Sequence, residues 1–258
     1  MIFMSGYGRV GWEAVTSGES GALVFRSADG SRYAKHVPAG RQDLLAQERN
    51  RVEWLGATGI PGPTVLDWHA DDDGAYLVTS AVRGTPADTV SASALHKAWP
   101  SITEAVRALH ALPPEQCPFS RDLARMLALA EDVVGRGAVN PEFLPAEQQE
   151  TPPEELLARL AAQVGERLEQ EDTVVCHGDL CLPNIILDPD TVDFAGFVDL
   201  GRLGTADRYA DIALLLANAR ETWGDDTAAD EAFARGYGIT LDAGRQRFYL
   251  HLDPLTWG

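Results

Sequence analysis

Three oxygen-bearing side chains, Asp179, Asn184 and Asp199, have the types and spacing that phosphoryl transfer needs. The first two belong to the segment VCHGDLCLPN, which lies between two apolar runs, and the third closes the later segment AGFVD. Amide and carboxylate oxygens suit Mg²⁺, which usually takes one or two carboxylates and completes its shell with phosphates and water. A further carboxylate can accept the proton of a hydroxyl. Because unpaired polar groups in apolar surroundings cost stability, this pattern favours chemistry over packing.

Two short strands would have to position these groups. Residues 185–187 and 195–199 are apolar runs that predict strands, and a hairpin spanning 184–199 would bring Asn184 and Asp199 to the same end. Asp179 would lie on the loop before the first strand. We therefore predict that Asn184 and Asp199 hold Mg²⁺ while Asp179 orients and deprotonates an acceptor hydroxyl.

The N-terminal part of the chain reads as a small antiparallel sheet with one helix. Turn-forming clusters separate the apolar runs, which is typical of hairpins. Charged residues between regularly spaced leucines predict the helix. The expected strands are 22–26, 32–37, 64–68 and 75–79, and the expected helix is 42–56.

After residue 84 the pattern becomes mainly helical. We expect one helix to begin with Thr151 as its N-cap, ahead of two prolines and two early acids, and to run to about Glu169. The other expected helices are one that ends at Pro113 and those over 121–134, 206–222, 226–236 and 242–252. The predicted fold class is α+β with two lobes: a small β-rich N-lobe, 1–83, and a larger, mainly helical C-lobe, 84–258.

Composition excludes several classes of protein. The net charge is -18, with 39 acidic and 21 basic residues and no basic cluster, so we expect no nucleic-acid partner. No long apolar run or signal peptide is present, so we expect no membrane span and a cytoplasmic protein. The 3 cysteines contain no CxxC pair, which disfavours disulfides and metal binding. Nothing fixes the oligomeric state, and we assume a monomer.

The layout of an aspartate, an asparagine five residues later and a further aspartate in D-x-G resembles protein kinases. It departs from them in reading HGD for H-R-D and DLG for D-F-G, and no A-P-E segment follows. The run from Val175 to Asp211, including VDLGRLGTADRYADIA, instead resembles the aminoglycoside phosphotransferases. The stretches HKAWPSITEAVRALHAL, QCPFSR, NPEFLP and LDPLTWG are similar to the streptomycin 3''-phosphotransferases of that family. The resemblance covers nearly the whole chain.

This resemblance implies a kinase-like fold that uses ATP and Mg²⁺. It makes Asp179 the catalytic residue and His177 a support of its loop. It also implies that Lys35 binds the α- and β-phosphates and pairs with Glu48. Residues Ser20 and Gly21 would belong to the turn that covers the phosphates. Asp211 would hold the catalytic loop through backbone amides.

The acceptor implied by the resemblance is streptomycin, a cation that carries guanidinium groups and needs carboxylates to bind it. The family places acceptor contacts near the chain end, which offers Asp253 and the terminal carboxylate of Gly258. Glu142 and Glu147 are weaker choices, and all four carboxylates could equally be solvated acids. Trp257 either packs against a sugar or closes the core, and Arg202 either reaches phosphate or pairs with an acid.

The expected function is transfer of the γ-phosphoryl group of ATP to the 3''-hydroxyl of streptomycin. One alternative is a kinase for another aminoglycoside or small alcohol. A second alternative is a regulatory pseudokinase, which is disfavoured because all three catalytic oxygens are present.

Overall fold

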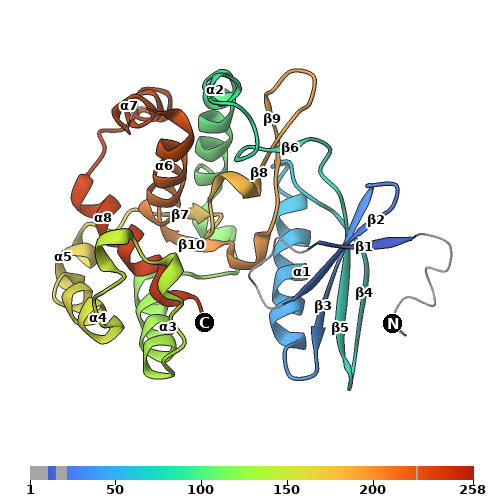
Figure 1. Cartoon of the computed structure of the whole chain (residues 1–258), viewed down its shortest axis with the longest axis horizontal. Coiled ribbons are helices and arrows are strands. Elements are labelled where there is room, and N and C mark those ends of the chain that lie inside the picture. Colours follow the sequence, from blue (N-terminus) through green and yellow to red (C-terminus); the bar gives the residue numbers. More distant parts are fainter. Residues whose placement is uncertain (1–10, 16–21, 225) are drawn as a thin grey trace. The chain divides into compact units, whose positions relative to one another are not determined.

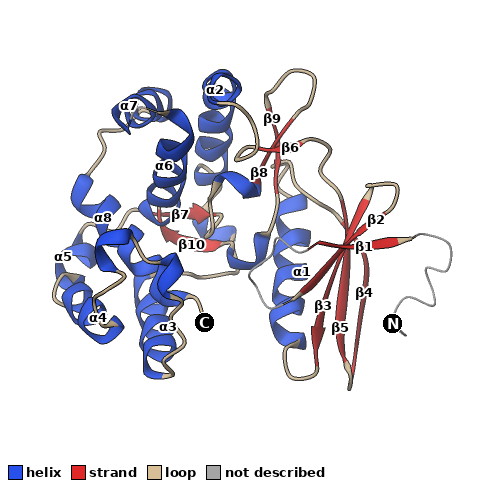
Figure 2. Cartoon of the chain, viewed as in Figure 1, coloured by secondary structure: helices blue, strands red, loops and turns tan. Residues whose placement is uncertain are grey.

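The computed structural model describes residues 11–15, 22–224 and 226–258 (Figures 1 and 2). The chain divides into two compact units. The first unit comprises Met1–Thr85, Ile186–Thr191 and Ala195–Gly201, and the second comprises Pro86–Ile185, Val192–Phe194 and Arg202–Gly258. The expected lobes placed one boundary at residue 83, whereas the first unit also takes in two later segments.

The first unit is built on a five-stranded antiparallel sheet with the order β1-β2-β3-β5-β4. Its strands are β1 (Trp12–Val15), β2 (Leu23–Ser27), β3 (Arg32–Pro38), β4 (Val65–Asp71) and β5 (Gly74–Ser80). Helix α1 (Gln42–Gly56) packs against β3, β4 and β5. Val37, Leu45, Ala75 and Leu77 form the buried cluster between them. The two predicted hairpins and the predicted helix are confirmed.

The second unit is mainly helical (Figure 2). Its longest helix, α2, contributes the fully buried Trp99, whose indole donates to the backbone oxygen of Ala229 at 3.2 Å. Strands β7 (Thr173–Cys176) and β10 (Gly204–Asp207) form a two-stranded antiparallel sheet. The helices are α2 (Ala92–His110), α3 (Leu123–Gly135), α4 (Pro153–Ala161), α5 (Val164–Glu169), α6 (Tyr209–Trp223), α7 (Asp226–Tyr237) and α8 (Ala243–Leu252).

A third sheet contains the strands that follow the loop of Asp179. Its order is β6-β8-β9, with β6 at Thr85–Pro86, β8 at Ile185–Leu187 and β9 at Phe194–Phe197. Strands β8 and β9 are hydrogen-bonded neighbours, as the predicted hairpin requires.

Two helix predictions are wrong at their boundaries. The residue before α4 is Pro152 rather than Thr151, and no side-chain cap forms there. This helix ends at Ala161, and α5 is a separate short helix, because Gln163 begins a new turn. The helix expected from residue 206 begins at Tyr209, since residues 204–207 pair with β7 instead. Apolar periodicity does not distinguish a short strand from the first turn of a helix.

None of the helices in the described part of the chain is both long and apolar enough to cross a membrane.

Candidate active site

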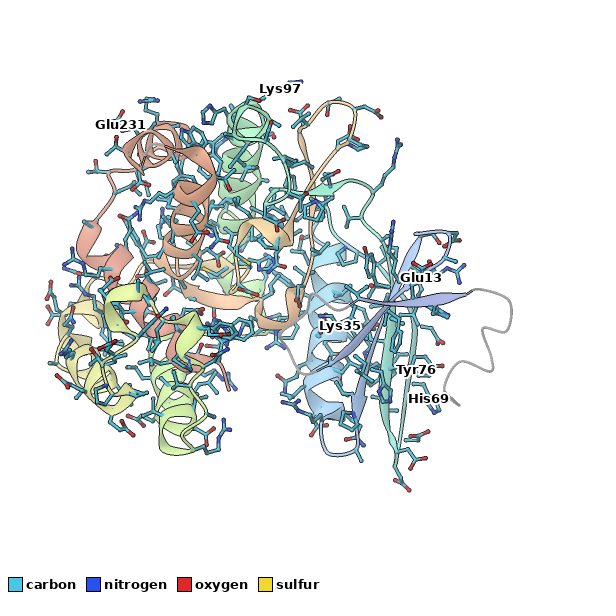
Figure 3. The ribbon with its side chains drawn as sticks, in the orientation of Figure 1. Glu13, Lys35, His69, Tyr76, Lys97 and Glu231 are labelled. Atoms are coloured by element: carbon cyan, nitrogen blue, oxygen red, sulfur yellow. The ribbon has the colours of Figure 1, made fainter. Side chains whose placement is uncertain are left out.

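In the first unit, Lys35, which is labelled in Figure 3, forms ion pairs with two carboxylates. It lies at the middle of β3, opposite Leu77 of β5, so hydrogen-bonded strands hold its backbone on both sides. Its Nζ lies 2.7 Å from Oε1 of Glu48 on α1 and 2.8 Å from Oδ1 of Asp199. The predicted pairing of Lys35 with Glu48 is therefore present, and Asp199 is a second partner that the sequence did not predict.

These two carboxylates keep the side chain of Lys35 protonated. Burial alone would lower its pKa, but the negative charges of Glu48 and Asp199 outweigh burial and raise the pKa above its usual range. Lys35 therefore remains a fixed ammonium at neutral pH, which is the form that binds phosphate oxygens.

Asp199 has a backbone conformation that is uncommon for its residue type. It follows β9 with φ of 59°, in the left-handed region that aspartate tolerates better than most residues. Such strain is retained where the surrounding structure imposes it, often at functional sites. Here it accompanies the contact of the carboxylate with Lys35.

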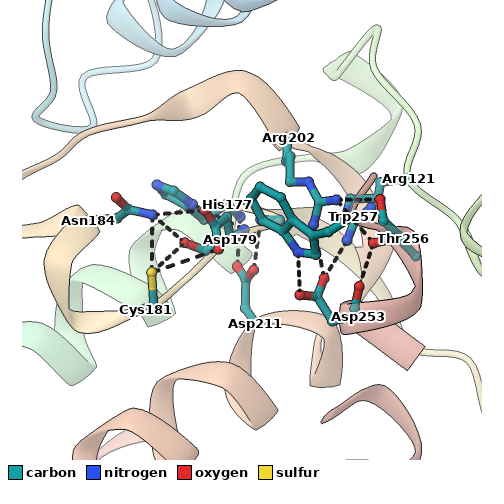
Figure 4. A network of polar contacts seen from close by, with 11 residues as sticks. Arg121, His177, Asp179, Cys181, Asn184, Arg202, Asp211, Asp253, Thr256 and Trp257 are labelled. Atoms are coloured by element: carbon teal, nitrogen blue, oxygen red, sulfur yellow. Dashed lines mark hydrogen bonds and ion pairs between the residues drawn. The ribbon is translucent and has the colours of Figure 1, made fainter. Parts of the chain in front are cut away.

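In the second unit, the catalytic loop runs from the end of β7 to the short 3₁₀ helix Leu182–Asn184. The side-chain amide of Asn184 donates to the backbone oxygen of Asp179 at 2.9 Å and to its Oδ2 at 3.1 Å (Figure 4). The same amide nitrogen lies 3.2 Å from Sγ of Cys181. These contacts fix the carboxylate of Asp179 relative to the loop.

Each unit supplies one oxygen ligand of the kind that a magnesium ion binds. The nitrogen of Asn184 is occupied by Asp179, which leaves its amide oxygen as the group able to bind a cation. The other proposed ligand, Asp199, is a carboxylate that is 43% exposed on its side chain. An amide oxygen and a carboxylate are the hard ligands that Mg²⁺ prefers.

The carboxylate of Asp211 holds the catalytic loop through two backbone N–H groups. Its Oδ2 accepts the backbone N–H of His177 at 2.7 Å, and its Oδ1 accepts that of Gly178 at 2.8 Å (Figure 4). The predicted role of Asp211 is thereby confirmed. His177 is fully buried and its Nδ1 accepts the backbone N–H of Asp179 at 3.3 Å, which is the geometry of a loop support.

Near the chain end, Asp253 is the centre of a group that we call the tail cluster: Arg121, Arg202, Asp253, Thr256 and Trp257 (Figure 4). Oδ1 of Asp253 lies 2.7 Å from Nη2 of Arg121 and 3.1 Å from Nη1 of Arg202. Its Oδ2 accepts the indole N–H of Trp257 at 2.9 Å. Asp253 is buried, and each of its oxygens has a protein partner.

The guanidinium of Arg202 lies over the ring of Trp257, 3.7 Å from its centroid, and donates to the backbone oxygen of Thr256 at 2.9 Å. Of the two roles left open for Arg202, the structure shows the pairing with an acid. Trp257 packs against this arginine and against Phe143.

The other residues predicted to contact the acceptor substrate lie in different surroundings. Gly258 is exposed at the chain end. Glu142 lines a cavity of about 460 Å³ together with Glu150, and Glu147 lies 3.8 Å from Nε2 of His251. That Asp253 and Gly258 contact an acceptor stays a prediction. Ser20 and Gly21 lie outside the described residues.

We expect the substitution Asp253→Ala to lower the free energy of unfolding by about 3–5 kcal/mol, because it leaves two largely buried guanidinium groups without their shared carboxylate. Urea denaturation at pH 7 measures the change. The control is Asp132→Ala, which removes an exposed ion pair with Arg136 and should cost less than about 1 kcal/mol. Equal losses in the two variants would contradict a structural role for Asp253.

Sequence reasoning missed Arg121 as a partner of Asp253, and His110 and Tyr237 behind Asp211. The first pair is separated by 132 positions. No local pattern marks contacts of this kind, because the side chains meet only after the helices have packed.

Comparison with known proteins identifies the family. The model of the phosphotransferase enzyme family matches residues 11–251. A streptomycin 3''-kinase of Streptomyces griseus is 61% identical over 252 residues, which cover 96% of this chain and 93% of that protein. An aminoglycoside 3'-phosphotransferase of Streptomyces fradiae is 40% identical over 265 residues, with 94% of each chain covered.

Solved structures of an aminoglycoside phosphotransferase also match this chain. The aminoglycoside phosphotransferase APH(3'')-Id of Streptomyces rimosus matches with a TM-score of 0.95 and 65% identity, covering 99% of this chain and 96% of that chain. The same enzyme in complex with ADP and streptomycin matches with a TM-score of 0.93 and 61% identity, covering 100% of both chains. The predicted kinase-like fold class is confirmed, and the chain belongs to the phosphotransferase enzyme family that includes these aminoglycoside phosphotransferases.

Proposed function

We propose that this protein is a streptomycin 3''-kinase, which transfers the γ-phosphoryl group of ATP to the 3''-hydroxyl of streptomycin. The observation that carries the proposal is the 61% identity with the streptomycin 3''-kinase of Streptomyces griseus over 96% of this chain. The ADP and streptomycin in the complex of the Streptomyces rimosus enzyme give it further support.

In the proposed reaction, the 3''-hydroxyl oxygen attacks the γ-phosphorus and the bond between that phosphorus and the β,γ-bridging oxygen breaks. Asp179 orients the hydroxyl and takes its proton, and ADP leaves with the bridging oxygen. The contacts of Asn184 with Asp179, 2.9 and 3.1 Å long, hold the accepting carboxylate. Positioning of this kind is a major part of catalysis of phosphoryl transfer.

Lys35 is proposed to bind the α- and β-phosphates of ATP as a point charge, with Glu48 fixing its position. The backbone amide of Gly21 and the hydroxyl of Ser20 are proposed to contact the phosphates. Asn184 and Asp199 are proposed to hold Mg²⁺, which when bound neutralises charge on the β- and γ-phosphates. The lobes 1–83 and 84–258 are proposed as the nucleotide-binding part and the catalytic and acceptor-binding part.

The net charge of -18 supports a cationic acceptor, because long-range attraction raises the local concentration of a guanidinium-bearing antibiotic. Asp253 and Gly258 are the proposed acceptor contacts. For Asp253 this would require a guanidinium group to approach a carboxylate that already has two arginine partners. Because ATP is a cytoplasmic substrate, we place the protein in the cytoplasm, and we assume that it acts as a monomer.

An ATP-consumption assay with streptomycin, kanamycin and choline tests the proposal. We expect turnover with streptomycin to exceed that with the other two by at least about 100-fold, and mass and phosphorus NMR spectra of the product to show one phosphate at the 3'' position. Preferred turnover of kanamycin or choline would instead support the alternative, a kinase for another aminoglycoside or small alcohol. ATP binding without turnover of any acceptor would favour a regulatory pseudokinase.

We expect Asp199→Ala to weaken Mg·ATP binding by about 10-fold or more and also to lower kcat. The change removes one proposed ligand and one of the two carboxylates that hold Lys35. Calorimetric titration with ATP at several magnesium concentrations measures the effect. The control Asp190→Ala removes an exposed partner of Arg83 in the same unit and should leave binding unaltered. An unchanged magnesium dependence in Asp199→Ala would contradict the ligand assignment.

A further inference from the structure

Behind the catalytic loop, three buried side chains form a continuous hydrogen-bonded chain, which we call the buried triad: Tyr237, His110 and Asp211. His110 is the last residue of α2 and Tyr237 the last residue of α7, while Asp211 belongs to the first turn of α6. Nδ1 of His110 lies 2.7 Å from the hydroxyl of Tyr237, and Nε2 lies 3.1 Å from Oδ2 of Asp211. Three helices that are distant in sequence therefore meet at the carboxylate that holds the catalytic loop.

The direction of these hydrogen bonds follows from the groups at the two ends of the buried triad. Burial raises the pKa of Tyr237 to about 12, so its hydroxyl keeps its proton at neutral pH and can donate to Nδ1 of His110. A neutral imidazole that accepts at one nitrogen donates at the other. Since an ionised carboxylate only accepts, Nε2–H of His110 donates to Asp211, and Nδ1 is left to accept from Tyr237.

The carboxylate of Asp211 is kept ionised in this arrangement. Burial alone would raise its pKa, but the hydrogen bond from His110 and the backbone N–H of Gly178 lower the pKa below its usual value. An ionised Asp211 accepts three donors: the backbone N–H groups of His177 and Gly178 and the imidazole of His110. In a low-dielectric interior the hydrogen bond from Tyr237 to His110 strengthens the next bond in the chain, from His110 to Asp211.

A metal centre is the competing explanation, because ligand atoms of His110, Cys176 and Asp211 lie within 4.8 Å of one another. The hydrogen bonds argue against it. Both nitrogens of His110 already have partners, and the thiol of Cys176 is directed at the backbone oxygens of Ala206 and Asp207, 3.8 and 3.5 Å from its Sγ. A metal would have to displace Tyr237 or the loop amides.

We propose that His110 and Tyr237 are positioning residues for phosphoryl transfer, which fix the catalytic loop through the carboxylate of Asp211. The hydroxyl of Tyr237 donates to Nδ1 and so holds the imidazole in the tautomer and orientation that donate to Asp211. The other tautomer would present a lone pair to a carboxylate and release one of its oxygens from its proper orientation. That carboxylate directly holds the amides of His177 and Gly178, which immediately precede Asp179. Small displacements of a catalytic group can cost about 100-fold in rate.

The inference rests on the proposed function, and Tyr237→Phe tests it. We expect kcat to fall by about 10- to 100-fold, with KM for ATP and for streptomycin changed by less than about 3-fold, because neither binding surface loses a group. The matched control is Tyr249→Phe, since the hydroxyl of Tyr249 is buried without a hydrogen-bond partner in the described structure. The control should keep wild-type kcat. Equal kcat in Tyr237→Phe and wild type would overturn the proposal.

A second pair of variants separates positioning from folding. His110→Gln can keep an amide N–H near Asp211, whereas His110→Leu keeps none. We expect kcat in the order wild type, His110→Gln, His110→Leu, with similar KM values and with ADP binding to one site per folded chain. If the stoichiometry of ADP binding falls in step with kcat, His110 has only a folding role.

Two further readouts remain valid even if the wild-type protein phosphorylates none of the acceptors tested. Nitrogen NMR of His110 should show the Nε2–H tautomer in the wild type, and the Nδ1 resonance should shift in Tyr237→Phe because it loses its hydrogen-bond donor. Amide hydrogen exchange at His177 and Gly178 should be faster in Tyr237→Phe and unchanged in Tyr249→Phe. No change in either readout would overturn the proposal, while inactivity of the wild type alone would overturn only the proposed function. Zinc found in the purified protein, lost together with activity on chelation, would favour a metal centre instead.

Discussion

Replacing Asp179 by alanine is expected to abolish phosphoryl transfer, with kcat lowered by about 100- to 10,000-fold, while ATP binding stays largely intact. The carboxylate is the group proposed to take the proton of the acceptor hydroxyl, whereas Lys35 is the group proposed to bind the phosphates of ATP. Two hydrogen bonds from the amide of Asn184 now hold Asp179, one to its Oδ2 and one to its backbone oxygen. Only the second survives in the variant, so the loop should keep its course while the chemistry stops.

The measurements are steady-state kinetics with streptomycin and calorimetric titration with ATP. Asp132→Ala is the control, because it removes a carboxylate of the same unit whose side chain is 59% exposed. That variant should retain wild-type values in both experiments. Near-normal turnover of Asp179→Ala would remove this residue from the reaction, and a parallel loss of ATP binding would assign it to the nucleotide instead.

The hydrophobic pattern was sufficient to predict most of the first unit and the long helices of the second. A strand such as β3 is recognised because turn residues bound an apolar run, and α1 because its leucines recur at helical spacing. Both signals are local. The boundary of α6 was placed too early because β10 pairs with β7, from which it is separated by 27 residues between Cys176 and Gly204. A strand formed by such pairing has no strong signature of its own.

The chemistry of the site was predictable to a similar extent. Fixed spacing within a motif pointed to Asp179 and Asn184, which the structure joins by hydrogen bonds, and the distant residue Lys35 was placed through the resemblance to a family. Sequence alone did not indicate that Asp253 would be buried between two arginines. The local sequence around such an aspartate is the same whether its carboxylate is solvated or buried. The arginine partners of Asp253 lie in the α2–α3 and β9–β10 connections, which are far away in the sequence.

Gly178 is the one residue of the catalytic loop at which this chain departs from the protein-kinase pattern. The chain reads HGD where protein kinases have H-R-D. Its φ is +82°, in the region that favours glycine, and a Cβ there would lie 2.2 Å from the backbone oxygen of Arg202. The obstruction is backbone, which cannot rotate away as a flexible side chain does. A side chain at this position is therefore excluded by the close approach of the segment that follows β9.

We expect Gly178→Ala to lower the free energy of unfolding by about 2–5 kcal/mol, from left-handed strain and overpacking together. The folded fraction should also lose at least about 100-fold in kcat, because moving this residue breaks the hydrogen bond from its N–H to Asp211 and displaces Asp179. Urea denaturation and kinetics normalised to active protein measure the two effects separately.

Gly137→Ala is the matched control. Gly137 also has a positive φ, +63°, but a Cβ there would meet no described atom within 4 Å. It should therefore carry only the backbone strain, about 1–2 kcal/mol at most, and keep full kcat. If both alanine variants lose the same stability and remain active, the contact with Arg202 does not constrain the loop. If only Gly178→Ala loses kcat, the backbone of Arg202 is what reserves this position for glycine and keeps Asp179 in place.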